Sequence, residues 1–287
     1  MVRPIGVLVG LGFVAALLWS LLWTAIGWVN EPEPETAVEW VEQHRPEKPV
    51  SFSFDGPFGK YDRQQLQRGY QIYAEVCSAC HSMHLVAFRD LESIGFSAAQ
   101  VKAIAKSKDV PSLNPDTGEP ATRKGLPSDY FPSPYPNEIA ARAANNNALP
   151  PDQSLLAKAR EGGPHYIYHL LTGYQDQPAE LLKKFPDAKT PDGLHYNPYF
   201  PNLNLAMAPP LTDGQVTYAP GNPKATLDQE AKDVAAFLMW AAEPKLEQRH
   251  RTGWAALVFL LIGTGFAYFA YKGIWADKKS GKVVAPA

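Results

Sequence analysis

The sequence predicts a mainly α-helical fold, with a central domain of long irregular loops between a C-terminal transmembrane helix and an N-terminal hydrophobic helix. Residues 5–28 and 254–271 contain no charged side chain. Each segment is close to or above the ~20 apolar residues that span ~30 Å of hydrocarbon. The chain also contains 27 prolines and 21 glycines, which predict a loop-rich domain between the two segments.

These observations divide the chain into five parts: residues 1–29, 30–50, 51–245, 246–275 and 276–287. The first is expected to be a retained transmembrane anchor. A signal sequence is the alternative, because Arg3 precedes it and Ala25-Ile26-Gly27 resembles a cleavage site, although signal cores usually run about 7–15 apolar residues. The second part, acidic and with four prolines, is expected to be an extended tether. The fourth is expected to be an anchor, and the lysine-rich fifth part a cytoplasmic tail.

Helical spacing and capping signals predict the helices of the central domain. The expected helices cover residues 64–76, 97–106, 137–145, 164–171 and 226–243. Ser97 and Thr226 open sequences of the capping-box type, and Asn137 is expected to be an N-cap. Pro244 predicts a break before the C-terminal hydrophobic segment. Residues 110–136 are expected to form a long loop.

The chemistry-bearing motif is Cys77-Ser78-Ala79-Cys80-His81, which has the spacing of a c-type haem attachment site. Two thiols at this spacing can add to the two vinyl groups of one porphyrin, while the imidazole of His81 binds the iron. Half a zinc site is one alternative, but the chain has no second cysteine pair. A redox dithiol is another, which His81 and the membrane context disfavour. We expect one covalently attached haem c, held by the domain of residues 51–245.

Met207 is the expected second axial ligand, by elimination among four methionines. Met1 begins the membrane segment, Met83 is too close to His81 to reach the opposite haem face, and Met239 lies in the helix leading to the membrane. Histidine ligation by one of three residues remains open on sequence alone: His165, His169 and His195. Methionine ligation raises the reduction potential, which suits a late carrier in an electron-transfer chain.

Further motifs resemble the cytochrome c1 family from about Asp55 to the C-terminal anchor. They are Arg68-Gly69-Tyr70-Gln71-Ile72-Tyr73, Arg142 through Pro150-Pro151-Asp152, Leu170 through Tyr174, Tyr196 through Phe200, Met207-Ala208-Pro209-Pro210, Ala231 through Val234, and Trp240 through Pro244. The resemblance implies a class I cytochrome c-like haem domain. It implies haem on Cys77 and Cys80, axial ligands His81 and Met207, and Arg142 near a haem propionate. Asn147 and Gln153 depart from the family's usual glycine and leucine.

The resemblance also implies a function. It predicts the haem c subunit of a bacterial quinol–cytochrome c reductase, a respiratory bc1 complex. The subunit lies beside cytochrome b in the bacterial inner membrane, with its haem domain in the periplasm. It takes electrons from the Rieske iron–sulfur protein and passes them to a soluble or tethered cytochrome c. This chain is expected to relay electrons without catalytic residues of its own. The alternative is a free-standing membrane-anchored monohaem cytochrome c that serves a terminal oxidase.

Charge is distributed unevenly along the chain. The formal net charge is -2, but residues 30–253 carry 28 acidic against 22 basic side chains. This region therefore lacks the excess of basic side chains that is typical of nucleic-acid-binding domains. The acidic excess is expected either to be a solvated surface or to attract a basic cytochrome c, because complementary charge mainly raises association rates.

Overall fold

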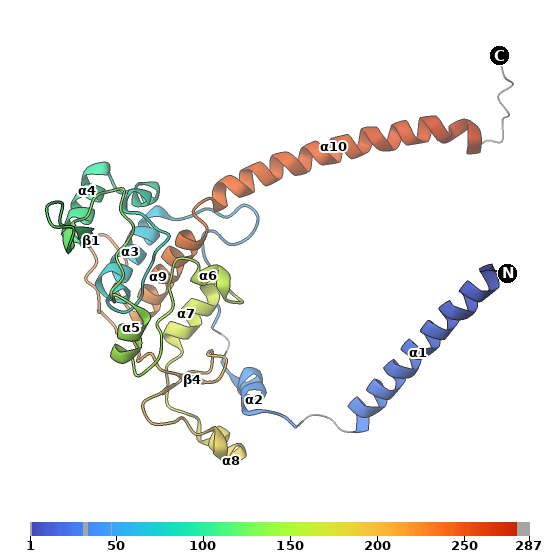
Figure 1. Ribbon diagram of the computed structural model, residues 1–287, viewed down its shortest axis with the longest axis horizontal. Helices are drawn as coiled ribbons and strands as arrows, with labels where there is room; N and C mark the ends of the chain where they lie inside the picture. The colour runs from blue at the N-terminus through green and yellow to red at the C-terminus, as the bar shows by residue number, and fades with distance from the viewer. Residues whose placement is uncertain (1, 31–33, 47, 280–287) are drawn as a thin grey trace. The chain divides into compact units, whose positions relative to one another are not determined.

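The computed structural model describes residues 2–30, 34–46 and 48–279, and it is mainly helical, as the sequence predicts (Figure 1). The chain groups into two compact units. The smaller unit contains Met1–Pro46 and Gln177–Lys189, and the larger contains Glu47–Asp176 and Thr190–Ala287.

In the smaller unit, α1 (Val2–Asn30) is an uninterrupted helix, and its Pro4–Asn30 segment is long and apolar enough to cross a membrane. The expectation of an extended tether over residues 30–50 is wrong for α2 (Ala37–His44). This helix forms because Thr36 and Glu39 make a capping box: Thr36 Oγ1 accepts from Glu39 N–H, and Glu39 Oε2 accepts from Thr36 N–H. Residues 31–33 and 47 of the expected tether lie outside the described residues.

The same unit contains α8 (Ala179–Lys184) and the 3₁₀ turn η3 (Pro186–Ala188). Lys184 forms an ion pair with Glu35, and its ammonium lies 6.0 Å from the centre of the Trp40 ring. These contacts join α8 to the segment around α2.

The larger unit holds the remaining elements. They are α3 (Arg63–Glu75), η1 (Cys77–Ala79), η2 (Phe88–Ile94), α4 (Ala98–Ser107), β1 (Asp109–Leu113), β2 (Pro120–Lys124), α5 (Glu138–Ala144), α6 (Leu156–Ala159), α7 (Pro164–Thr172), β3 (His195–Tyr196), β4 (Asn204–Leu205), α9 (Leu227–Ala242) and α10 (Leu246–Lys279). Of the predicted caps, Ser97 makes a full capping box, whereas Asn137 and Thr226 each accept one backbone N–H.

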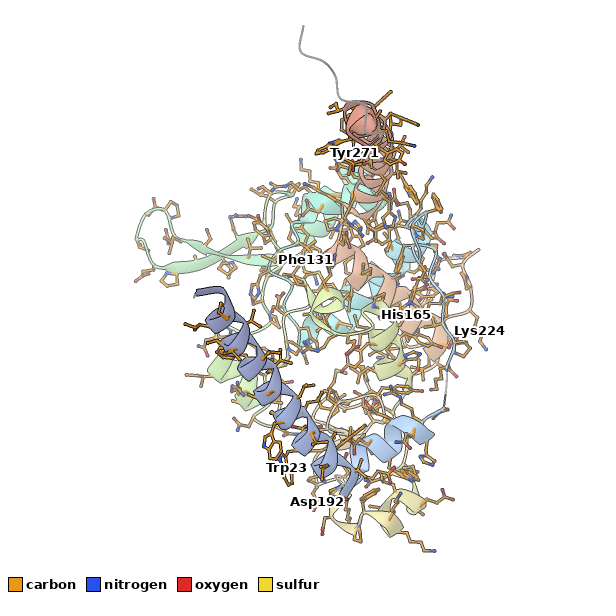
Figure 2. All side chains as sticks on the ribbon, turned by 90° about the vertical axis from the view of Figure 1, so that its right-hand side faces the viewer. Trp23, Phe131, His165, Asp192, Lys224 and Tyr271 are labelled. Atoms are coloured by element: carbon orange, nitrogen blue, oxygen red, sulfur yellow. The ribbon has the colours of Figure 1, made fainter. Side chains whose placement is uncertain are left out.

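The core of the larger unit lies where α3 packs against α9. Ile72 of α3 and Phe237 and Trp240 of α9 are fully or almost fully buried. A Cβ atom at Gly69 would lie only 2.1 Å from the carbonyl oxygen of Asp233, so glycine is required for the two helices to approach this closely. Phe131, labelled in Figure 2, packs among Tyr70, Tyr73 and Phe88 and extends this aromatic core.

The expectation that residues 110–136 form one long loop is wrong, because β1 and β2 pair as an antiparallel hairpin. Val110 lies opposite Arg123, and Leu113 opposite Pro120. The turn is closed by Asn114, whose side chain accepts from Asp116 N–H at 2.9 Å, and by Gly118 at a φ of 72°. Asparagine and glycine stabilise such turns by local hydrogen bonds and a left-handed backbone.

The last helix, α10, begins after the break that Pro244 predicts, because α9 ends at Ala242. Its Leu246–Ala276 segment is long and apolar enough to cross a membrane. Figure 1 shows α10 as a long helix extending from the end of α9, and Figure 2 shows side chains around it near Tyr271. Residues 280–287 of the expected tail lie outside the described residues.

Candidate functional site

The two cysteines and His81 lie on one turn that follows directly from α3. The turn is tight: Cys80 N–H and His81 N–H both donate to Cys77 O, at 3.1 and 2.9 Å. Ser78 Oγ donates back to Ala74 O at 2.9 Å and fixes the turn on the helix end. Both cysteines are free thiols. The turn therefore presents two unpaired thiols and an imidazole within five residues.

The His81 ring is oriented by the backbone of a distant segment. Its Nδ1 lies 2.9 Å from Pro151 O, so the neutral imidazole donates from Nδ1 and keeps Nε2 as a free lone pair. Burial lowers the pKa of His81, which favours the neutral form. A ring held through one nitrogen with the other available is the usual state of a metal-ligating histidine.

The segment that orients His81 is itself fastened to the residues after the cysteine turn. Gln153 N–H donates to Ser82 O at 2.9 Å, and Asp152 Oδ2 accepts from Ser82 Oγ and His84 N–H, each at 2.9 Å. Burial raises the pKa of Asp152, but hydrogen bonds from Ser154, His84 and Ser82 outweigh it and the net shift is downward. Asp152 therefore remains an acceptor that stabilises the contact between the two segments.

His84 bridges this carboxylate to a third segment. Its Nδ1 lies 2.7 Å from Asp152 Oδ2, and its Nε2 lies 2.7 Å from Ser133 Oγ. Ser133 and Tyr135 belong to the proline-rich stretch after the hairpin. Tyr135 contacts Cys80, with its hydroxyl 3.9 Å from the sulfur.

Two hollows border the cysteine turn. The first is lined by four aromatic side chains, two prolines and Ala74, together with polar or charged residues that include Ser78, Lys108 and Asp109; the aromatic residues are Tyr70, Tyr73, Phe88 and Phe131. The second is lined by Cys80, His84, Tyr135, Leu149 and Pro150, among others. The aromatic and proline side chains in these walls, next to free thiols, suit a flat, apolar macrocycle such as haem. The residues of this turn therefore fit the haem c that the sequence predicts.

Arg142, which the family resemblance places near a haem propionate, lies on α5 and is exposed. Its Nη1 donates to Asn147 O at 3.0 Å, and Asn147 N–H donates back to Arg142 O at 2.9 Å. Asn146 and Asn147 have positive φ angles of 50° and 63°. Asparagine tolerates this left-handed region, which explains how Asn147 can stand where glycine is usual.

Gln153, the second departure from the family pattern, is buried. Its Oε1 has no hydrogen-bond partner among the described residues. The backbone of Gln153 holds Ser82, but nothing in the structure explains the choice of its side chain.

Met207 lies on a separate segment, two residues after β4. It is half-buried, and its carbonyl oxygen accepts from the Tyr174 hydroxyl at 3.0 Å. Pro209 and Pro210 follow, and then Leu211 enters the core. The axial role of Met207 stays a prediction.

Two of the three competing histidines have other partners. His165 Nε2 lies 3.3 Å from Asp55 Oδ1, and His169 Nε2 lies 2.7 Å from Lys48 O. His195 makes an edge contact with Tyr174. A hydrogen bond through one ring nitrogen is compatible with metal ligation through the other, as at His81, so these contacts do not choose between Met207 and the histidines. Within the described ranges there is also no cluster of three or more His, Cys, Asp or Glu side chains suited to a metal ion.

Comparison with known proteins identifies the family. Residues 52–278 match the model of the Cytochrome C1 family. This chain belongs to the cytochrome c1 family. Cys77, Cys80, His81, Arg142 and Met207 all lie within the matched residues.

Several relatives in this family share close to half of their aligned residues with the chain. The cytochrome c1 of Rhodospirillum rubrum is 46% identical over 237 residues, which cover 79% of this chain and 87% of that protein. The mitochondrial cytochrome c1 heme protein of Kluyveromyces lactis is 44% identical over 233 residues, covering 81% and 77%. The cytochrome b/c1 of Bradyrhizobium diazoefficiens is 49% identical over 244 residues, which cover 79% of this chain but only 35% of that longer protein.

The contacts that organise the site are not predictable from the sequence motifs. Pro151 O orients His81, and Asp152 holds Ser82 and His84. Neither role was predicted. The one indication in the sequence was the Pro150-Pro151-Asp152 motif, which is part of the cytochrome c1 resemblance. That resemblance does not say what these residues do. Every residue has a backbone carbonyl oxygen, so the sequence cannot show that the one at Pro151 accepts from His81.

Proposed function

We propose that this chain is the haem c electron-transfer subunit of a quinol–cytochrome c reductase. Haem c, when bound, supplies a one-electron redox centre. In this proposal Cys77 and Cys80 hold it covalently, and His81 and Met207 are its axial ligands. The observation that carries the proposal is the turn that joins the two free thiols to His81, whose Nδ1 is held by Pro151 O and whose Nε2 is left for iron.

Arg142 is proposed to bind a haem propionate by charge-assisted hydrogen bonds. A guanidinium has five N–H donors, and one donor of Arg142 is used on Asn147 O. The remaining donors are available to a carboxylate, and the paired backbone of Arg142 and Asn147 fixes the helix end from which the side chain projects.

The proposed partners are cytochrome b, a Rieske iron–sulfur protein as electron donor, and a soluble or tethered cytochrome c as acceptor. The relative named cytochrome b/c1 supports an assembly with a cytochrome b. The two apolar helices support anchoring in a bacterial inner membrane, with residues 30–253 in the periplasm. This side of the membrane is proposed because c-type haem is attached outside the cytoplasm.

Copurification tests the assembly. The full chain, tagged at its C-terminus, is extracted from its native membrane in mild detergent. Spectra of b-type haem and the electron paramagnetic resonance signal of a reduced Rieske centre are expected in the same fraction, at a constant ratio to haem c. A haem-loaded chain that elutes without either would contradict the proposal and support the free-standing cytochrome.

Topology is tested separately with alkaline phosphatase fusions, which are active only outside the cytoplasm. A fusion in the Lys183 region is expected to be active and a fusion after Ala287 inactive. Activity after Ala287 would overturn the placement of the C-terminal end.

A further inference from the structure

A loop of the larger unit rests on the first turns of α10. The Phe58 ring stacks on the Trp254 ring, with centroids 4.8 Å apart and planes within 1° of parallel. Trp254 Nε1 donates to Pro57 O at 3.1 Å, and His250 Nδ1 lies 3.4 Å from Gly59 O. The loop therefore contacts two successive turns of the helix through both side chain and backbone.

Polar contacts fix the base of this loop. Glu247 of α10 accepts from Tyr61 N–H at 2.9 Å and from Arg63 Nη2 at 3.1 Å. The Tyr61 hydroxyl donates to Glu243 O at 3.0 Å and lies 3.3 Å from Met239 O. The base of the loop and the start of the helix are thus held together by hydrogen bonds close to the stacked rings.

The stacked pair continues the apolar surface of the helix. Phe58 is 73% exposed and Trp254 40% exposed, and the next apolar residues of α10, Leu257 and Val258, are about half exposed. Tryptophan and other aromatic residues are enriched where a membrane span meets the headgroups, because an apolar ring and a polar edge suit that boundary. An aromatic ring of the domain therefore lies beside the residue that marks one end of the span.

Two basic side chains lie next in the sequence to residues of this junction. Lys60 directly follows Gly59, whose carbonyl oxygen lies near His250 Nδ1, and Arg251 directly follows His250. Both basic side chains are exposed. Neither forms an ion pair within the part of the chain that the structure describes. Cations placed beside an interfacial aromatic suit the phosphate groups of anionic lipids. An apolar protein partner would have no group for these two cations to bind, whereas a lipid phosphate does.

We propose that Phe58, Trp254, Lys60 and Arg251 form a lipid-binding surface. The two rings lie among the headgroups of the outer leaflet, and the two cations bind phosphates of anionic phospholipids. This surface holds the haem domain at a fixed height above the bilayer. The proposal rests on the membrane span of α10 and not on haem ligation.

Photo-crosslinking in the full chain tests this surface. The photoreactive residue p-benzoylphenylalanine replaces Phe58 in native membranes, and covalently bound haem confirms that the domain has folded. After irradiation, mass spectrometry of the 58-containing peptide is expected to show phospholipid adducts. Matched positions are Leu113, exposed on the hairpin, which is expected to give no lipid adduct, and Phe259, exposed within the span, which is expected to give one.

The positions separate two kinds of failure. Lipid adducts at 259 with only protein adducts, or none, at 58 would overturn the lipid surface and leave the span intact. The absence of lipid adducts at both positions would overturn the span together with the surface. Lipid adducts at 113 equal to those at 58 would show unselective labelling and would also contradict the proposal.

The headgroup preference is measured in nanodiscs that mix phosphatidylglycerol with phosphatidylcholine. Adducts at 58 are expected to be enriched in phosphatidylglycerol, and the enrichment is expected to be lost in Lys60→Gln with Arg251→Gln. Replacement of Lys124, which lies on the hairpin and pairs with Asp109, by Gln is the control and should leave it unchanged. Equal labelling of both lipids by the unaltered chain would overturn the role of the two cations.

Discussion

Arg68 and Asp233 form a buried ion pair between α3 and α9, with Arg68 Nε 2.7 Å from Oδ2 and Nη2 3.0 Å from Oδ1 of the carboxylate. Asp233 also accepts from Gln65, Gln229 and the Tyr218 hydroxyl, so its two oxygens receive five hydrogen bonds. The pair joins the helix that leads into the cysteine turn to the helix that leads toward the membrane. It also holds the segment that follows Met207, through Tyr218.

Replacing Arg68 by Met is expected to destabilise the protein strongly. Removing one partner of a buried ion pair leaves an uncompensated charge and costs about 3–5 kcal/mol. The measurement is the free energy of unfolding in urea, followed by the Soret band and circular dichroism. The double replacement Arg68→Met with Asp233→Leu is expected to lose less than the sum of the losses of the two single variants, because each single change already removes the ion pair. An additive loss would contradict the coupling.

Replacing Gly69 by Ala is expected to force α3 and α9 apart, because the new Cβ would lie 2.1 Å from Asp233 O. Overpacking of this kind costs about 1–3 kcal/mol. The control is Gly253→Ala on α10, where nothing lies within 4 Å of the new Cβ. Equal melting temperatures for the two variants would show that the close approach does not limit the packing.

Glu230 is expected to make stability fall as pH rises. Its Oε1 accepts from Val216 N–H at 3.0 Å and its Oε2 has no partner among the described residues. Burial, with Asp213 and Asp233 nearby, raises its pKa above 4.5. The folded state therefore binds this proton more tightly than the unfolded state does. The stabilisation is complete below pH 4.5 and is lost as pH rises through the folded pKa.

The Glu230→Gln variant tests this sign. Gln keeps an acceptor for Val216 N–H but cannot ionise. Unfolding free energies measured from pH 4.5 upward are expected to decline less steeply for Glu230→Gln than for the unaltered protein. Parallel curves would show that Glu230 does not titrate in this range.

The acidic excess of residues 30–253 predicts a salt-dependent reaction with a basic cytochrome c. Screening shortens the Debye length from ~10 Å at 0.1 M to ~3 Å at 1 M salt, so electrostatic attraction fades. The bimolecular rate of electron transfer, measured by stopped flow, is expected to fall as salt rises. A flat profile would exclude steering and indicate a tethered or apolar-docking partner.

Most of the longer helices of the larger unit could be predicted because their signals are local, whereas α6 and the 3₁₀ helix η2 were not among the expected helices. Ser97, Asn137 and Thr226 each cap a helix at the expected position. Helix α3 begins at Arg63, one residue before the predicted start, because Asp62 caps it by accepting from Gln64 N–H and Gln65 N–H. The hairpin and α2 were missed although Asn114, Gly118, Thr36 and Glu39 carry turn and capping signals, which are weak in segments rich in proline and charge.

The candidate site was predictable only in part. Cys77, Cys80 and His81 follow from a compact motif, and the structure brings them onto one turn. The contacts of Pro151 with His81 and of Asp152 with Ser82 and His84 join residues far apart in the sequence, and no local pattern encodes such pairings. Met207 is expected as the second axial ligand only because the other three methionines are excluded. Such elimination gives no information on the distance between Met207 and His81.

The most direct test of haem ligation is the spectrum of Met207→Leu. Loss of the methionine–iron charge-transfer band and a lower reduction potential are expected, with haem still attached to Cys77 and Cys80, because a thioether ligand raises the potential of haem iron. An unchanged band and potential would contradict ligation by Met207 and return the role to His165, His169 or His195.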